Sequence, residues 1–263
     1  MVHESGVTYY RSARLAAMGV RHCFSTRLGG TSAGVFATLN LGNPSGTSAA
    51  DSEENMRGNY HRLSVSAGLP WSRCWARQVH GNGVLRVERG REFENGRQAD
   101  ALVSDDPSRA LCIRTADCAA VLMASEGGRV IAAVHAGWRG VVADVVGAAA
   151  RAMVAAGAAP VAAAVFPCIS MRNFEVGLEV VKAFRAQGLM AHEVPETGKG
   201  RAGVAESCAL QMVRCGVRRE AIELSGECTF GSAADFYSHR RDGAATGRMA
   251  LLAVPSGAKV MVR

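Results

Sequence analysis

The stretch Ala110–Gly140, ALCIRTADCAAVLMASEGGRVIAAVHAGWRG, decides the fold class, and the rest of the chain is organised around it. Its apolar, β-branched runs are typical of buried strands and cover Leu111–Ile113 with Val121–Met123, and then Val130–Val134. Each run lies beside a turn with a reactive side chain, Cys118 in one turn and His135 in the other. We expect Cys118 and His135 to converge at the ends of adjacent strands. Gly137 and Gly140 leave room for a ligand to approach the backbone there.

The chain has 263 residues, 48% of them hydrophobic and 20% charged, as in ordinary soluble globular proteins. This length predicts one domain spanning residues 1–263. No apolar run approaches the ~20 residues that span a bilayer, and the segment MVHESGVTYYRSARLAAMGV lacks the apolar core of a signal peptide. We therefore expect a cytoplasmic protein without a membrane partner, whose eight Cys stay reduced.

The net charge of +7 favours anionic partners, but the basic residues are scattered and only 6% of the residues are aromatic. A nucleic-acid-binding protein would carry a basic stripe interleaved with aromatic side chains, so we expect no nucleic-acid partner. A small anionic substrate such as phosphate fits the charge. The sequence leaves the oligomeric state open.

Periodicity and turn residues predict the other elements. Strands are expected over residues 7–27, 74–80, 161–166 and 248–254, and helices over residues 51–67, 141–156, 175–186 and 205–215. Strands and helices alternate irregularly, which favours an α/β (α+β) fold with a mixed sheet over a doubly wound parallel sheet.

The loop Leu28–Asn43 contains Gly30-Thr31-Ser32-Ala33-Gly34, which matches the G-x-S-x-G pattern of a nucleophile elbow. An elbow needs a helix directly after it, and the residues that follow here are poor helix formers. We therefore interpret the segment as a rim loop. Arg27 and Asn40 bracket this loop and are candidates for contacting the substrate.

Three residues, His80, Cys118 and His135, occupy matching settings at strand ends beside small residues. Three protein ligands with a fourth position left to water describe a catalytic zinc site. The same residues also suit a dyad with Cys118 as nucleophile and His135 as base, or a single copper ion. The seven His include no H-x-H pair, which argues against a trinuclear copper cluster.

Two neighbours of this set are further candidates. Asp117 suits a general acid or base, a residue that orients a ligand, or a simple turn residue, and the sequence does not separate these roles. Arg139 precedes Gly140 at the expected start of a helix, where free N–H groups favour an anion such as phosphate.

Several motifs, taken in order, resemble those of the YfiH family of laccase-domain proteins, and they cover nearly the whole chain. The motifs are Ser25–Gly30, Asn40–Gly42, Gln78–Gly81, Ala99–Val103, Thr115–Cys118, His135–Gly140, Phe174–Gly177 and Ser238–Gly243. The resemblance implies a layered α/β/β/α fold, also likened to cysteine hydrolases such as cytotoxic necrotizing factor. It implies metal ligation by His80, Cys118 and His135.

The resemblance implies three alternative activities. The first is zinc-dependent phosphorolysis of adenosine, inosine and methylthioadenosine, together with adenosine deamination, with a purine nucleoside and phosphate as small-molecule partners. In that reading Arg27, Arg139 or the helix start at Gly140 would hold the phosphate. The second is a peptidoglycan-editing amide hydrolase that removes a misincorporated amino acid from a UDP-muramyl precursor. The third is a copper-dependent polyphenol oxidase, or laccase.

The sequence departs from the family pattern at two places. Phe166 stands where the family usually has Gly, before Pro167-Cys168-Ile169, and we expect it to narrow the pocket or alter the turn. The usual Leu-Asp-Leu is missing around Gly203–Ala205. Both changes are expected to affect substrate choice more than the metal site. Whether Cys168 and Cys228 approach the site is left open.

Overall fold

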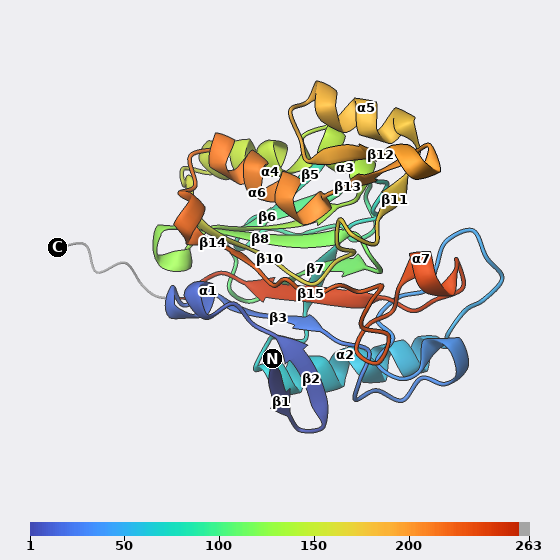
Figure 1. Ribbon diagram of the computed structural model, residues 1–263. Helices are drawn as coiled ribbons and strands as arrows, with labels where there is room; N and C mark the ends of the chain where they lie inside the picture. The colour runs from blue at the N-terminus through green and yellow to red at the C-terminus, as the bar shows by residue number, and fades with distance from the viewer. Residues whose placement is uncertain (258–263) are drawn as a thin grey trace.

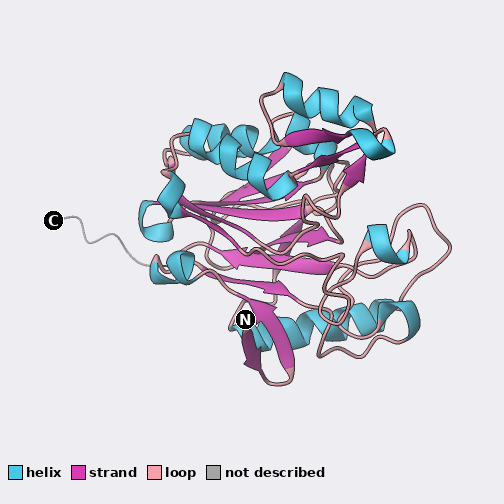
Figure 2. Ribbon diagram, in the orientation of Figure 1, coloured by secondary structure: helices cyan, strands magenta, loops and turns pink. Residues whose placement is uncertain are grey.

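The computed structural model describes residues 1–257, in which two six-stranded sheets stack face to face between outer helices (Figure 1). Figure 2 shows the strands in the middle of the molecule and the helices outside them. This is the layered α/β/β/α arrangement with mixed sheets that the family resemblance implied. No helix in this part of the chain is long and apolar enough to cross a membrane.

The first sheet has the strand order β1-β2-β3-β15-β7-β4. Its strands are β1 (Val2–Glu4), β2 (Val7–Tyr10), β3 (Arg21–Ser25), β15 (Met249–Val254), β7 (Ala110–Thr115) and β4 (Arg73–Trp75). Neighbours are antiparallel except for the parallel pair β7 and β4. The late strand β15 therefore lies between β3 and β7, as expected for a strand that returns to the sheet.

The second sheet has the order β14-β10-β8-β9-β6-β5, and its two outermost pairs are parallel. Its strands are β14 (Ile222–Leu224), β10 (Pro160–Val165), β8 (Ala119–Ser125), β9 (Ile131–Ala136), β6 (Ala101–Ser104) and β5 (Val84–Val87). A small antiparallel sheet consists of β11 (Glu175–Val176), β13 (Lys199–Ala202) and β12 (Ala191–Val194).

Helices cover the outer faces of both large sheets. Helix α2 (Glu53–Ala67) packs on the first sheet, and α4 (Val145–Ala155) and α6 (Val204–Arg214) pack on the second. The others are α1 (Ala13–Ala17), α3 (Trp138–Val142), α5 (Leu178–Ala186) and α7 (His239–Asp242). Short 3₁₀ turns cover Gly34–Phe36, Glu126–Gly128, Pro195–Thr197 and Arg219–Ala221.

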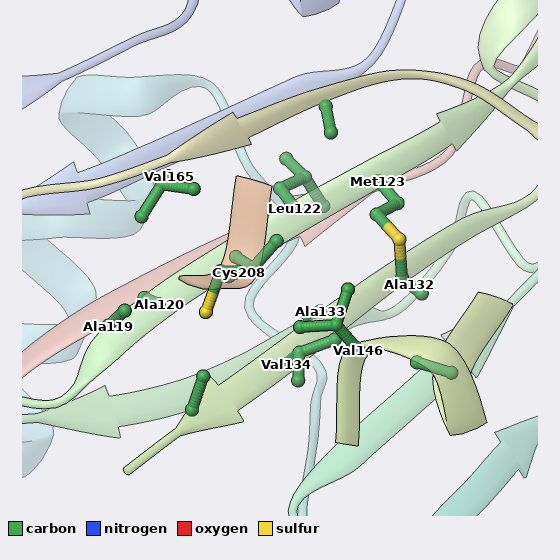
Figure 3. Close-up of a cluster of buried hydrophobic side chains, with 14 of the residues drawn as sticks. Ala119, Ala120, Leu122, Met123, Ala132, Ala133, Val134, Val146, Val165 and Cys208 are labelled. Carbon is green, nitrogen blue, oxygen red and sulfur yellow. The ribbon is translucent and has the colours of Figure 1, made fainter. Parts of the chain in front are cut away.

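The central strands β8 and β9 are buried along their whole length, because one face meets the first sheet and the other meets α4 and α6. Figure 3 shows side chains of these strands packed together with Val146 of α4 and Cys208 of α6. A strand buried on both faces carries a continuous apolar run, which is the pattern that the sequence showed. This core fixes the ends of β8 and β9, where Cys118 and His135 lie.

Four expected elements are wrong in detail. The strand expected over residues 74–80 ends at Trp75. Residues 7–27 form two strands with α1 between them, because the Ser12 side chain accepts a hydrogen bond from the Leu15 N–H and caps a helix. The expected helix over 141–156 is two helices, since Asp144 adopts a left-handed conformation at φ 60° and interrupts it. The segment 175–186 begins as β11 before α5 starts. By contrast, the helix expected over residues 51–67 is present as α2, with Ser52 as its N-cap and Gly68 as its C-cap.

Candidate metal centre

His80, Cys118 and His135 converge at the ends of the central strands β8 and β9 of the second sheet, as the sequence predicted. Strands β8 and β9 are antiparallel with Ala119 opposite Ala136, so the residue before β8 meets the end of β9. The loop after β4 brings His80 to the same point with its backbone at φ 59°. The ligand atoms of the three side chains all lie within 4.8 Å of one another, and the two imidazole rings are 4.9 Å apart. The set can hold one metal ion.

Asp100, which precedes β6, fixes both histidines from a fully buried position. Its Oδ1 accepts a hydrogen bond from His135 Nδ1 at 2.8 Å, so His135 has its Nε2 free for the site. The same carboxylate accepts the backbone N–H groups of Val79, His80 and Gly81 at 3.2, 2.9 and 2.8 Å. Burial raises the pKa of Asp100, but these hydrogen bonds outweigh it and keep the pKa below its usual range.

The Cys118 thiol and the His135 imidazole favour a charged pair. Burial raises the pKa of Cys118, but the charge of His135 and hydrogen bonds from His135 and His80 lower that pKa further than burial raises it. Burial lowers the pKa of His135, and the Cys118 thiolate together with Asp100 reverses this and raises it. A thiolate is both the metal-binding and the nucleophilic form of cysteine.

Two positions of the His135–Gly140 motif, Gly137 and Gly140, have no room for a side chain. A Cβ on Gly137 would lie 2.7 Å from His80 Cδ2 and 3.1 Å from Cys118 Sγ. A Cβ on Gly140 would lie 2.8 Å from the carbonyl oxygen of Gly81. The motif therefore packs directly against the loop that carries His80. The space expected at these glycines for a bound ligand is taken up by His80, Gly81 and Cys118 of the protein itself.

Asp117 ties the turn before β8 to a distant loop. Its carboxylate accepts hydrogen bonds from Thr229 Oγ1 at 2.6 Å, Ser238 Oγ at 3.0 Å and the Arg240 N–H at 2.7 Å. Its backbone lies at φ 88°, a left-handed conformation that a non-glycine residue rarely adopts. Both carboxylate oxygens are thus engaged in holding the turn that carries Cys118.

Two cavities flank the three ligands, and His80, Ala116, Cys118 and His239 line both. The first, of about 470 Å³, has a largely apolar wall and is called the apolar cavity here. Its wall includes Trp138, Arg139, Ile169, Phe174, Glu175, Val180 and Val204. The second, of about 320 Å³, is called the arginine cavity and includes Asn43, Ser45, Arg77, Gln78, Arg114 and Arg248.

Sequence reasoning missed the arginine cavity. Arg114 is the penultimate residue of β7, Arg248 precedes β15 and Arg77 follows β4. These three strands are neighbours in the first sheet. Within residues 1–257, no carboxylate lies within salt-bridge distance of these three guanidinium groups. Burial lowers the pKa of Arg248, which marks how little water surrounds its charge. These three arginines, which are far apart in the sequence, come together because their strands are neighbours in the first sheet.

Arg27 and Asn40 line neither cavity, so their expected contact with substrate has no support in the geometry. Arg27 Nε donates to the Ala37 carbonyl at 2.9 Å and its guanidinium stacks on Tyr237. Asn40 is fully buried, and its amide donates to Asp51 at 3.0 Å. Both residues hold the loop between them. Arg139 does line the apolar cavity, with its guanidinium over the Trp138 ring.

The segment Gly30–Gly34 lacks the geometry of a nucleophile elbow, because only the 3₁₀ turn Gly34–Phe36 follows it and the buried Ser32 hydroxyl donates to Asp51. Phe166 is also buried and stacks on Phe24 with 5.6 Å between ring centroids, so it does not narrow either cavity. Cys168 and Cys228 pair through a backbone bridge and line neither cavity. Val204, at the missing Leu-Asp-Leu, does line the apolar cavity.

The family described as multi-copper polyphenol oxidoreductase laccase matches residues 21–255 of this sequence. The chain belongs to this family. A relative from Escherichia coli K12 named purine nucleoside phosphorylase YfiH is 36% identical over 88% of this chain and 92% of its own. A Deinococcus radiodurans relative named purine nucleoside phosphorylase is 37% identical over 95% and 94%.

Solved structures of the family share the fold. YlmD from Geobacillus stearothermophilus superposes with a TM-score of 0.85 at 27% identity, covering 97% of this chain and 98% of that one. The Neisseria meningitidis protein NMB0706 is 31% identical with a TM-score of 0.74, covering 97% and 100%. The resemblance to the YfiH family that the motifs indicated is therefore confirmed.

Proposed function

We propose that this chain is a purine nucleoside phosphorylase for adenosine, inosine and methylthioadenosine, with zinc bound by His80, Cys118 and His135. The names of the relatives support the reaction class. The observation that carries the proposal is the pair of cavities that meet at His80 and Cys118. A phosphorolysis needs two substrates side by side, one flat and mostly apolar and the other a small dianion.

In this proposal the arginine cavity holds the phosphate. Arg77 and Arg114 supply guanidinium groups with no acidic partner within residues 1–257, and Gln78, Asn43 and Ser45 add hydrogen-bonding groups. Arginine matches the geometry of phosphate oxygens and stays charged at all relevant pH values. These residues take over the role that the sequence suggested for Arg27.

The apolar cavity holds the nucleoside, with Trp138 and Phe174 offering flat surfaces for the purine. Arg139 and Arg240 lie over these two rings at 4.3 and 5.1 Å and leave the cavity partly charged at its mouth. A phosphate oxygen forms a bond to C1′ of the ribose while the bond from C1′ to N9 breaks. The purine leaves with that electron pair and takes up a proton, and ribose 1-phosphate remains.

The residues present fit a metal ion. The two imidazoles and the thiolate are the donors that zinc prefers, and Gly137 leaves the close space that a Cβ would fill. Zinc bound there would polarise a substrate atom and lower the pKa of a bound water. Asp100 would orient His135 as a ligand through the Nδ1 contact. Asp117 would hold the Cys118 turn, and a direct acid–base role is not part of this proposal.

Adenosine deamination belongs to the same proposal and needs activated water at C6 of the purine in place of phosphate at C1′. We would incubate the metal-analysed protein with adenosine, with and without phosphate, and identify the products by chromatography. Adenine with ribose 1-phosphate, formed only with phosphate, is the expected result, and inosine would reveal deamination. Full phosphorolysis by Cys118→Ala, His80→Ala and His135→Ala would show that the proposal is wrong.

One observation favours a second candidate, an amide hydrolase acting on a UDP-muramyl precursor. Asp100, His135 and Cys118 form a chain of contacts in which a carboxylate orients an imidazole beside a thiol, as in cysteine hydrolases. This candidate predicts phosphate-independent release of an amino acid. Polyphenol oxidation by a single copper ion at the same three residues is the third candidate, and it predicts oxygen consumption with phenols.

A further inference from the structure

A separate groove is lined by residues of α2 and of the segment around β4. It has a volume of about 790 Å³ and is called the tryptophan groove here. Its principal side chains are Tyr60, Trp71, Arg73, Trp75 and Arg114, with Glu53 and Arg57 from α2. Apart from Arg114, it shares no lining residue with either cavity at the metal centre.

The groove exposes unusual aromatic surface. Two of the three tryptophans of the chain line it, and Trp71 and Trp75 are 47% and 37% exposed. Tryptophan is among the residues that stack best on flat aromatic ligands, and exposed pairs in one hollow mark binding sites more than ordinary surface. A groove of this volume lies in the range of small-molecule sites.

The guanidinium group of Arg73 places a positive charge in the groove. Its guanidinium lies 3.8 Å from the Tyr60 ring centre and 4.6 Å from that of Trp71, so the two rings hold it in place. Its Nη1 is buried without a hydrogen-bond partner, and within residues 1–257 no carboxylate forms an ion pair with it. Because no acidic side chain of the described residues neutralises this charge, an anionic ligand in the groove gains from pairing with the guanidinium group. Arg57 and Arg114 add two positive charges to the lining and Glu53 and Glu54 add two negative ones, so the groove keeps an excess of one positive charge.

We propose that the tryptophan groove binds a small ligand that combines a flat aromatic ring with a phosphate, such as a 5′-mononucleotide. The ring stacks on Trp71 or Trp75, and the phosphate pairs with Arg73. Glu53 on the opposite wall offers a carboxylate to sugar hydroxyls. Arg114 also lines the arginine cavity, but Arg73 and Trp71 line neither cavity at the metal centre, so variants at these two residues test the groove separately from the proposed function.

The test uses the full chain with Trp138→Phe, which leaves Trp71 and Trp75, both in the groove, as the only tryptophans. The probe is adenosine 5′-monophosphate, and the measurement is the change in tryptophan fluorescence. We expect a saturable change, with the dissociation constant raised at least tenfold by Arg73→Gln. Because Arg73 packs on Tyr60, the half-exposed Trp71→Leu serves as a second variant that disturbs the fold less.

Arg62→Gln is the matched control, since Arg62 is an exposed arginine of α2 that does not line the groove, and it should leave the affinity unchanged. Adenosine and inorganic phosphate are the comparison ligands. Binding of adenosine as tight as that of the monophosphate would refute the role of Arg73. Binding of phosphate alone just as tight would refute the stacking. The proposal would be overturned if the monophosphate showed no saturable binding. It would also be overturned if Arg73→Gln and Trp71→Leu both bound it as tightly as the parent Trp138→Phe protein does.

Discussion

Replacing Gly137 by Ala tests whether the metal centre depends on close backbone approach. Gly137 has φ −75°, which any residue adopts, so an added methyl acts through space alone. The new Cβ would lie 2.7 Å from His80 Cδ2, whereas carbon atoms in contact prefer ~3.5–4.0 Å. The imidazole must therefore move by about 1 Å or the α3 start must shift, because Cys118 Sγ blocks the other side at 3.1 Å.

A displacement of about 1 Å at a reacting centre costs about a hundredfold in rate, and overpacking costs about 1–3 kcal/mol of stability. We expect Gly137→Ala to lower kcat/KM for phosphorolysis by about a hundredfold, or ~2.7 kcal/mol of transition-state stabilisation. Zinc affinity, measured by competition with a chromophoric chelator, should fall by ~10–100-fold.

The matched control is Gly83→Ala, where the added Cβ meets its nearest atom at 3.6 Å, an ordinary contact. That variant should keep its zinc affinity and its turnover. The reasoning would be refuted if Gly137→Ala kept both at the wild-type level while thermal denaturation showed a folded protein. Loss of turnover with unchanged zinc affinity would place the effect on the substrate and contradict the steric account of the ligands.

Three other expectations follow from single contacts. Asp100→Asn should lower zinc affinity by ~10–100-fold because His135 loses its anionic partner, and chelator competition should show no such loss for Asp106→Asn, a buried carboxylate elsewhere. Arg77→Gln should raise the KM for phosphate by about tenfold and leave that for adenosine within about twofold, whereas an equal rise in both would contradict the arginine cavity. Burial lowers the pKa of His22 to about 4 from 6.5, so stability should be complete above pH 6.5 and fall by about 3 kcal/mol as the pH drops toward 4. Urea denaturation at pH 7.5, 6 and 5 measures this slope, and a flat profile would contradict it.

The ligand set could be predicted because local pattern carried it. Cys118 precedes β8 and His135 lies near the end of β9, and the apolar runs of both strands predict that they are buried. An antiparallel pair of short strands brings these ends together. The prediction of one helix over residues 141–156 was wrong for a local reason that the periodicity of apolar residues does not show. Asp144 adopts a left-handed conformation and stops α3 before α4 begins, although the surrounding apolar residues continue the helical spacing.

The arginine cavity could not be predicted because it depends on strand order. Arg77, Arg114 and Arg248 are far apart in the sequence, and only the insertion of β15 beside β7 brings the last of them to the others. Arg27 and Asn40 show the reverse case. Their position around a loop suggested substrate contact, but polar side chains at loop ends also satisfy backbone and buried partners, and here they do so.

The position of β15 also affects how the first sheet folds while the chain is being synthesised. Strands β3 and β7 leave the ribosome long before Met249–Val254, and both of their facing edges stay unpaired until that segment has been synthesised. At ~5–20 residues per second, more than a hundred residues between β7 and β15 correspond to a delay on the order of 10 s. Exposed strand edges invite pairing with other chains. Aggregation during synthesis, and its relief by chaperones, should therefore depend on how soon β15 arrives.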